Sequence, residues 1–341
     1  MNVEVVRLAA EREPAYAGFV AAHPAALISY TLGYRDLLAE LLGCEARYAV
    51  ALSDGAVVGV MPLMRQAGAR GAVLNSLPYF GSNGGPLALS AEAGRALGAW
   101  YEDEVRSDDV LAATVVANPL ADADAQIGGD LDDMRVGHVT PLSGAGDPHA
   151  RIVAAIDGSA RRNVAKAERC GTRVTIDNEA FGVLESLHRR SMDAIGAPVK
   201  TPAFFSAVAR HFRAGADYDI YVAQIAGDAV AALLVFYCAT TVDYYVPAVS
   251  PDHRSEQPMA PIILQAMTDA AQRGMAHWNW GGSWPAHESL QRFKAKWGGV
   301  PREYRYATTL NDRDVLNARP EDLLADYPGF FVVPFSRLIA S

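Results

Sequence analysis

Apolar and polar residues alternate along this chain in short stretches that predict a mixture of strands and helices. Apolar runs at residues 48–52 and 56–64 flank Asp54-Gly55, which is the pattern of a tight β-hairpin. A second pair of runs, at residues 221–225 and 229–238, flanks Ala226-Gly227-Asp228. Helical spacing of apolar residues predicts helices within residues 14–42, 91–106, 160–169, 181–194, 202–213 and 258–273. Further strands are expected within residues 71–89, 110–117, 172–176, 242–246 and 276–280. The expected fold class is therefore α/β with mixed sheets.

The two hairpin segments indicate that the chain repeats one plan. Residues 48–60 align with residues 221–233 without a gap, and each segment reads as an aromatic residue, a strand, a turn and a longer strand. Residues 121–150 are rich in Gly, Asp and Ala, so we interpret them as a loop or connector. We therefore expect two α/β halves that meet near residues 140–155. The predicted domains are residues 1–145 and 146–310, with a C-terminal extension at 311–341 that packs on the body.

Composition narrows the class of protein further. Half of the residues are hydrophobic, as in a packed globular protein, and 30 basic against 39 acidic residues give a net charge of −9. That balance argues against a broad DNA-binding surface. The three cysteines show no CxxC spacing, which favours a reducing cytoplasm. The longest apolar run, residues 229–239, is far shorter than the roughly 20 residues of a membrane helix, so we expect a buried strand and no membrane insertion.

A basic helix is expected at residues 159–169, with Ser159 as its N-cap. Small apolar residues share one face of this helix, and cations gather on another. The cations are Arg161, Arg162, Lys166 and Arg169. One interpretation is a binding site for an anionic group such as phosphate, which guanidinium groups bind in a bidentate manner. The other is an ordinary solvated charged face.

A second group of residues follows the strand at 276–280. Two glycines and Ser283 end this strand, and a helix that contains Phe293 and Lys294 comes next. Glycines there allow a ligand to approach the backbone closely. Lys294 could place an ammonium in a partly desolvated cleft and stabilise an oxyanion, or it could be a surface lysine on a packed helix. Four of the five tryptophans lie in this region, at 278, 280, 284 and 297, and we expect most of them in the core.

Several chemistries lack their motifs. The sequence contains no GxxxxGK[ST], no GxGxxG and no GxSxG, so phosphate-loop, dinucleotide-binding and serine-elbow sites are not expected. His277 and His287 do not form an HExxH pattern, and no metal site is predicted.

Residues 159–171 resemble the R-x-N-x-x-K-A-x-x-x-G segment of FemAB-like proteins. Residues 292–299, followed by Pro301 and Tyr304, are similar to the R-F-K-x-x-[FW]-G and P-x-x-Y segments of the same group. The N-terminal half also looks similar, at residues 59–63, 76–79 and 84–85. The resemblance covers about residues 15–310. It points to FemAB-like or BioF2-like acyltransferases of the GNAT superfamily, which are related to the Fem aminoacyltransferases of peptidoglycan synthesis.

This resemblance implies tandem GNAT-like domains, with the catalytic motif in the second. It implies that Lys294 and Phe293 lie at the acyl-transfer centre, and that an arginine of the basic helix contacts the phosphates of the acceptor. Arg161 and Arg162 both remain candidates for that arginine, and Lys166 would assist it. Further substrate-binding candidates are Tyr244, Tyr245, Ser283, Tyr79 and Asn83. Tyr244 and Tyr245 should point to opposite faces of their strand, so at most one of their hydroxyls can reach a cleft. The general base is not identified, and Asp243 and Glu288 are weak options.

The expected function is transfer of an acyl or aminoacyl group to a primary amine. The acceptor would be a small phosphate-bearing or nucleotide-linked precursor of the cell envelope, a polysaccharide or a natural product. No tightly bound cofactor is expected, and the donor would be acyl-CoA or aminoacyl-tRNA as a co-substrate. Residues 253–260 lack the glycines with which GNAT enzymes usually cradle the CoA pyrophosphate, so the donor stays open. The alternative function is that of a non-catalytic GNAT-fold protein that binds an anionic ligand.

Overall fold

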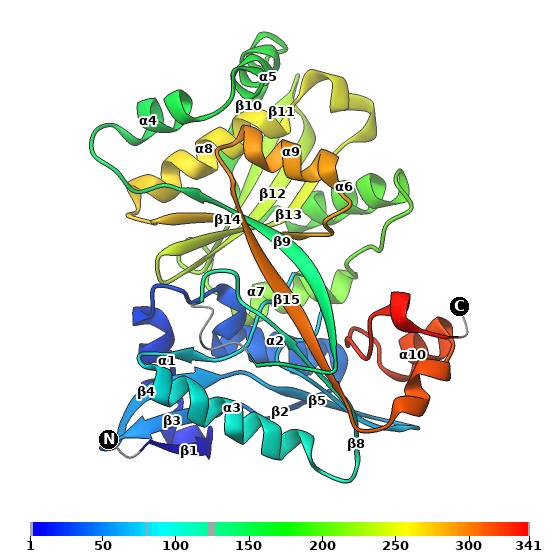
Figure 1. Cartoon of the computed structure of the whole chain (residues 1–341). Helices are drawn as coiled ribbons and strands as arrows, with labels where there is room; N and C mark the ends of the chain where they lie inside the picture. The colour runs from blue at the N-terminus through cyan, green and yellow to red at the C-terminus, as the bar shows by residue number, and fades with distance from the viewer. Residues whose placement is uncertain (1–2, 80, 122–126, 340–341) are drawn as a thin grey trace. The chain divides into compact units, whose positions relative to one another are not determined.

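The computed structural model describes residues 3–79, 81–121 and 127–339, and these residues divide into two compact units. Unit 1 comprises residues up to 135 together with residues from 303 onward, and unit 2 comprises residues 136–302. The chain passes from unit 1 to unit 2 within strand β9 (Leu131–Pro141) and returns within strand β15 (Val300–Leu310). Figure 1 shows both strands. The boundaries thus differ from the expected domains, because residues 136–145 belong to unit 2 and residues 303–341 belong to unit 1.

Unit 1 holds two groups of strands with helices beside them. One sheet has the order β1-β3-β4-β7, and the strands β15, β8, β6, β5 and β2 follow one another in the other group. The elements are β1 (Glu4–Arg7), α1 (Glu13–Ala22), α2 (Leu32–Leu42), β2 (Glu45–Ala46), β3 (Ala49–Ser53), β4 (Ala56–Met61), β5 (Met64–Gly68), β6 (Gly71–Asn75), β7 (Leu87–Ala88), α3 (Ala91–Val105), β8 (Val110–Val116) and α10 (Pro320–Asp326). The predicted hairpin is present, and both Asp54 and Gly55 of its turn have positive φ angles.

Unit 2 is built on strands in the order β10-β11-β12-β13-β14-β9. Every neighbouring pair is antiparallel except β13–β14, which is parallel. The elements are α4 (Pro148–Ala155), α5 (Gly158–Arg169), β10 (Arg173–Ile176), α6 (Phe181–Asp193), α7 (Pro202–His211), β11 (Tyr218–Ile225), β12 (Asp228–Cys238), β13 (Thr241–Val249), α8 (Met259–Gln272), β14 (His277–Ser283) and α9 (Glu288–Lys296). The apolar run at 229–239 is a buried strand, as expected.

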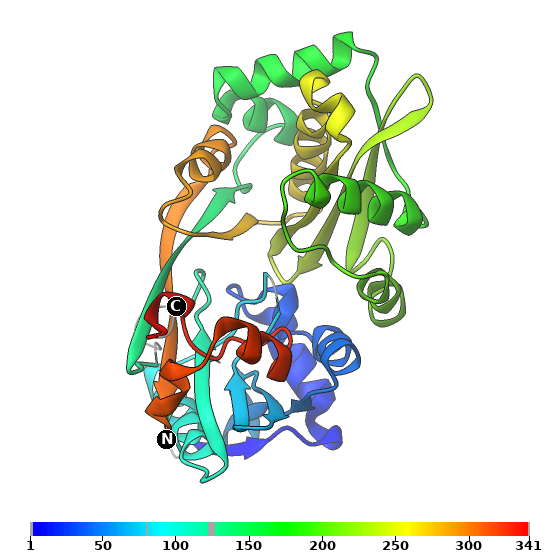
Figure 2. The same cartoon turned by 90° about the vertical axis from the view of Figure 1, so that its right-hand side faces the viewer.

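Helices α6 and α8 cover the central strands of unit 2. Figure 2 shows them on opposite faces of β12 and β13. Helix α8 contributes Ala260, Ile263, Met267 and Ala270 to a core that also contains Trp278, and these helix residues are three or four positions apart. Burying such an apolar stripe is what fixes a helix on a sheet. Every helix among the described residues is too short or too polar to cross a membrane.

Two local expectations were wrong. Residues 121–150, taken as a connector, contain strand β9 and helix α4, although residues 122–126 lie outside the described residues. Charged residues and a glycine interrupt the apolar alternation of β9, so the strand depends on its pairing with its two neighbours, β14 and β15. The cap of α5 is Asp157 rather than Ser159, because the Ser159 N–H donates to Asp157 Oδ1 at 2.7 Å. Strand β15 was also not anticipated.

Candidate functional site

The irregular end of strand β14 is the centre of the candidate site. In its pairing with β9, Asn279 lies opposite Val139 and Gly282 lies opposite Gly137. Trp280 and Gly281 therefore face the single residue His138, which is the arrangement of a β-bulge. Bulges bend a strand and redirect its groups, and they are frequent beside active sites. Gly281 has φ +68°, a conformation that glycine adopts without strain.

Lys294 of helix α9 directs its ammonium at this bulge. Its side chain is buried, and Nζ donates to the carbonyl oxygens of Gly281 at 2.8 Å and Gly282 at 3.3 Å. Burial lowers the pKa of Lys294 to about 8, so the ammonium is still the main form at neutral pH. An ammonium has three N–H donors, and the two carbonyls use two of them. The third can stabilise negative charge that develops on a substrate oxygen.

Aromatic residues hold helix α9 against the bulged strand. The rings of Phe293 and Trp280 meet edge to face, with centroids 5.8 Å apart. Thr140 Oγ1 donates to the Trp297 carbonyl at 3.0 Å and accepts from Trp280 Nε1 at 2.9 Å. Three of the four clustered tryptophans are buried and Trp284 is about half exposed, so the expectation that most lie in the core is confirmed. These contacts fix the place from which Lys294 reaches the bulge.

A pocket of about 350 Å³ opens between helices α5, α8 and α9 of unit 2. This volume is within the range of small-molecule sites. The α9 residues in its wall share one face of that helix. The lining residues are Ala160, Asn163, Gln257, Met259, Ala260, Ile263, Ser289, Arg292, Phe293, Lys296 and Trp297. The wall thus combines an apolar and aromatic floor with two cations, two side-chain amides and a hydroxyl.

The first turn of helix α8 contributes to the same pocket. Met259 and Ala260 belong to that turn, and no side chain caps it by a hydrogen bond. The Ala260 N–H of this turn donates to Gln257 O at 3.0 Å and Pro261 has no N–H, so it is the helix dipole that favours an anionic group there. Arg292 and Lys296 of α9 are exposed and add positive charge to the same wall. Phe293 lines the pocket, and the next residue, Lys294, serves the bulge.

The structure separates the two arginines that the sequence left as alternatives. Arg161 Nη1 donates to the carbonyl oxygens of Val153 at 3.0 Å and Ile156 at 2.6 Å, so this guanidinium holds the end of α4. Arg162 is exposed and forms no hydrogen bond or ion pair with the part of the chain that the structure describes. Lys166 is also exposed.

The two tyrosines of strand β13 point to opposite faces, as predicted. Tyr244 packs against Trp280, with ring centroids 5.0 Å apart, whereas Tyr245 packs against Phe236 at 5.0 Å on the other face. Only Tyr244 therefore shares the side of the sheet that carries the bulge tryptophan. Ser283 is buried, and its hydroxyl donates to the Val136 carbonyl at 3.1 Å.

Tyr79 and Asn83 belong to unit 1, and each donates a hydrogen bond to another segment of that unit. The Tyr79 N–H donates to Gly329 O at 2.8 Å. Asn83 Nδ2 donates to Ala117 O at 2.8 Å. Phe80, in the same Gly-rich loop, lies outside the described residues.

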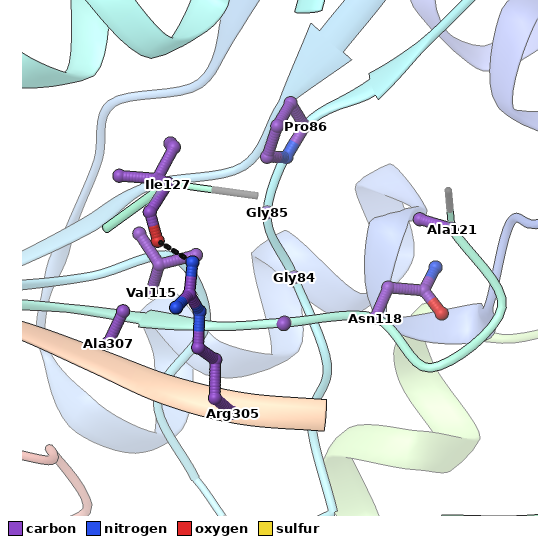
Figure 3. A pocket seen from close by; sticks show the side chains of 10 residues that line it. Gly84, Gly85, Pro86, Val115, Asn118, Ala121, Ile127, Arg305 and Ala307 are labelled. Atoms are coloured by element: carbon purple, nitrogen blue, oxygen red, sulfur yellow. Dashed lines mark hydrogen bonds between the residues drawn. The ribbon is translucent and has the colours of Figure 1, made fainter. Parts of the chain in front are cut away.

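A small pocket of unit 1 lies beside the Gly-rich loop. Figure 3 shows Gly84 and Gly85 along its wall, with Arg305 donating to the Ile127 carbonyl oxygen at 3.4 Å. The pocket holds about 20 Å³, which is room for about one water molecule. It is therefore too small to receive a substrate.

No pattern in the sequence singles out five residues that the structure places at the site, namely His138, Thr140, Asn163, Gln257 and Lys296. His138 and Thr140 lie in the segment taken as a connector. Only the β-branched residues around them, in Val136-Gly137-His138-Val139-Thr140, could have indicated a strand. No group of three or more potential metal ligands is present among the residues that the structure covers.

Comparison with known proteins agrees with this architecture. Residues 158–294 match the family described as acetyltransferase (GNAT) domain. The structure is similar to the crystal structure of FemX, with a TM-score of 0.70 and 14% identity over 89% of this chain and 96% of that chain. It is also similar to the C-terminal domain of a protein described as a lysylphosphatidylglycerol synthetase from Agrobacterium fabrum. That match has a TM-score of 0.57 and 12% identity over 95% of this chain and 99% of that chain. Sequence comparison with curated proteins gave no match.

The fold is therefore α/β with mixed sheets and tandem GNAT-like domains. The resemblance to FemAB-like proteins of the GNAT superfamily is confirmed at the level of the fold.

Proposed function

We propose that this protein is an N-acyltransferase that moves an acyl or aminoacyl group to a primary amine. The observation that carries the proposal is the buried ammonium of Lys294. It is fixed by two backbone carbonyls, has one N–H donor left and follows Phe293 in a GNAT-type domain. A buried, fixed cation of this kind is suited to stabilising an oxyanion, because little reorganisation is needed when the charge develops.

The reaction follows from these groups. The neutral amine of the acceptor attacks the carbonyl carbon of an ester or thioester, and a C–N bond forms. The carbonyl oxygen becomes an oxyanion, which the third N–H of Lys294 stabilises. The bond from carbon to the leaving oxygen or sulfur then breaks, and the proton released by the amine ends on the leaving group. Removing one oxyanion donor typically lowers kcat by about 10²–10³.

The pocket between α5, α8 and α9 is proposed to hold the phosphate-bearing part of the donor. Acyl-CoA and aminoacyl-tRNA both carry phosphates, and Arg292, Lys296 and the positive end of the α8 dipole are suited to them. The aromatic floor at Phe293 and Trp297 would receive the apolar or planar part of the same molecule. The acyl carbonyl would then lie close to the residue that follows Phe293.

The acceptor is proposed to be a small amine that carries phosphate or another anionic group. Arg162 is the better candidate for contacting that group, because Arg161 already binds two backbone carbonyls. Lys166, one turn further along α5, would support it. Of the two tyrosines on β13, Tyr244 is the candidate for the substrate side, since it packs on Trp280.

The test is a screen of the purified chain with acetyl-CoA or aminoacyl-tRNA as donor and amino sugars, with and without phosphate, as acceptors. Release of the thiol or of deacylated tRNA and the mass of the product report transfer. Lys294→Met should lower kcat by about 10²–10³. Lys296→Met, a change of the same kind in the pocket wall, should act mainly on KM. Full activity of Lys294→Met would show that the assignment is wrong.

A second function has one observation in its favour. The segment before α8, residues 251–256, forms a 3-10 helix without glycine, unlike the usual CoA-binding loop of GNAT enzymes. A protein with this segment could bind an anionic ligand without transferring an acyl group. Saturable binding of acetyl-CoA or of a phosphorylated amino sugar, with no turnover on any donor, would support this function instead.

A further inference from the structure

The buried histidine His138 has a ring nitrogen without a hydrogen-bond partner among the described residues. It lies on β9 opposite the bulge of β14, and only 3% of it is exposed. Its Nδ1 atom is buried and makes no hydrogen bond with any described residue. A buried polar atom without a partner typically costs about 1–3 kcal/mol. Such atoms are uncommon in folded proteins and call for an explanation, such as a role in catalysis.

His138 lies beside Lys294. The loop after α9 packs both residues together at Gly299, whose N–H donates to Lys294 O at 3.1 Å. A Cβ atom at Gly299 would lie 2.7 Å from Lys294 O and 3.3 Å from the His138 Cβ. The end of the helix therefore touches the strand at His138, and only glycine fits between them. Among the described residues, the charged group that perturbs His138 is the Lys294 ammonium.

The two side chains hold opposite protonation states at neutral pH. Burial, and then the positive charge of Lys294, lower the pKa of His138 below its ordinary value of 6.5, so its imidazole is neutral. The pKa of Lys294 is about 8, so Lys294 is an ammonium. A neutral imidazole has one nitrogen that accepts a proton, and an ammonium only donates. In active sites, the acid and base roles usually belong to neighbouring groups whose environments give them different protonation states.

We propose that His138 is the proton acceptor of the acyl transfer and works at the bulge as a pair with Lys294. The inference rests on the proposed function. When the C–N bond forms, the carbonyl oxygen becomes negative and the amine nitrogen becomes positive. Lys294 donates to the oxygen, and His138 takes the proton from the nitrogen, directly or through one water molecule. When the bond to the leaving oxygen or sulfur breaks, the imidazolium returns this proton to the leaving group.

The neighbouring ammonium explains why the proton is returned. An imidazolium beside Lys294 is repelled, so it is a stronger acid than an isolated imidazolium. The same repulsion keeps His138 neutral before the reaction. His138 thus begins and ends each turnover neutral, and Lys294 remains a cation. In this proposal His138, and not Asp243 or Glu288, is the general base. Asp243 accepts a hydrogen bond from Asn279 at 2.7 Å, and Glu288 forms an exposed ion pair with Arg292.

The first experiment measures the protonation of His138 without relying on activity. Full-length protein with 15N-labelled histidine is titrated by NMR, and His138→Gln identifies the resonance. We expect His138 to titrate below 6.5, and Lys294→Met to raise its pKa because the positive charge is removed. Lys294→Gln serves in the same way if the methionine variant does not fold. A His138 that titrates above 7.5, or a pKa that neither Lys294 variant changes, would overturn the proposal.

The second experiment measures turnover with the donor and acceptor found in the screen. His138→Gln should lower kcat by about 10²–10⁴, the usual contribution of a general base, with a much smaller change in KM. His277→Gln is the matched control, because His277 is a part-buried histidine on β14 whose pKa is also lowered by burial, and it should leave kcat unchanged. Full kcat in His138→Gln would overturn the role of His138 alone. A wild-type protein without turnover on any donor would overturn the proposed function and, with it, this role.

Discussion

Replacing Lys294 by methionine should make the folded protein more stable at neutral pH while it removes the proposed activity. A lysine in water has a pKa of 10.5, and burial lowers that of Lys294 to about 8. One pKa unit corresponds to about 1.4 kcal/mol, so the buried ammonium costs the folded state about 3 kcal/mol at pH 7. Methionine avoids this cost but loses the hydrogen bonds to Gly281 and Gly282. Because both glycines are partly exposed, water can replace those bonds, and their loss costs about 1–2 kcal/mol.

The pH dependence of this effect tests the reasoning independently of the hydrogen bonds. Between pH 8 and 10.5 the unfolded chain holds the Lys294 proton and the folded protein does not. The free energy of unfolding of the wild type should therefore rise with pH in this window relative to the variant. The variant should be more stable by about 1–2 kcal/mol at pH 7, and this advantage should be lost before pH 10.

Urea denaturation at pH 7, 8, 9 and 10 measures the difference between the two proteins. Lys296→Met, at an exposed lysine of the same helix, should change the free energy of unfolding by less than about 0.5 kcal/mol. A difference between wild type and Lys294→Met that stays constant from pH 7 to 10 would refute the account. It would mean that Lys294 is not buried as an ammonium.

Three other changes test unit 2, one on the far face of its sheet and two beside the site. Burial lowers the pKa of Lys200 to about 7. Lys200→Met should therefore raise the free energy of unfolding at pH 6 by up to about 4 kcal/mol. This gain should shrink between pH 7 and 10.5, because the wild type becomes more stable over that range. Thr140→Val should lower the free energy of unfolding by about 2–4 kcal/mol, because Trp280 Nε1 and the Trp297 carbonyl lose their hydrogen-bond partner. Tryptophan fluorescence during denaturation would measure this loss of stability. Gly299→Ala should lower the melting temperature and the proposed activity together, because the added Cβ would lie 2.7 Å from Lys294 O. Unchanged activity of this variant would contradict the close packing at Gly299.

The stabilising effect expected of Lys294→Met bears on why the residue is there. A buried, charged lysine lowers stability, and within the described residues the hydrogen bonds of Lys294 go to backbone carbonyls and not to a carboxylate. Groups that reduce stability in this way are concentrated at functional sites. The orphaned Nδ1 of His138 beside it is a second such group. Two unfavourable features side by side support the proposed site at the bulge.

Sequence reasoning was most successful where structure depends on neighbouring residues. The Asp54-Gly55 turn predicts its hairpin because only a few residues tolerate positive φ, and the apolar spacing of residues 258–273 predicts α8 because one helix face must be buried. Strand β9 was missed for the opposite reason. Its residues include Asp, Arg and Gly, and the strand exists because it pairs with β14 and β15, which lie more than a hundred residues further along the chain.

The sequence by itself determined the hairpins, the main helices, the basic face of α5 and the motif that contains Phe293 and Lys294. The hairpins, helices and basic face follow from local spacing and residue type, whereas the motif was identified by its resemblance to FemAB-like proteins. Only the tertiary structure decided that Lys294 is buried against a bulge, that Arg161 is already occupied by α4 and that His138 lies beside the ammonium. The physical reason is that burial and pairing register depend on which distant segments meet. The protonation state of a lysine or histidine in turn depends on that burial, and no spacing along the chain encodes it.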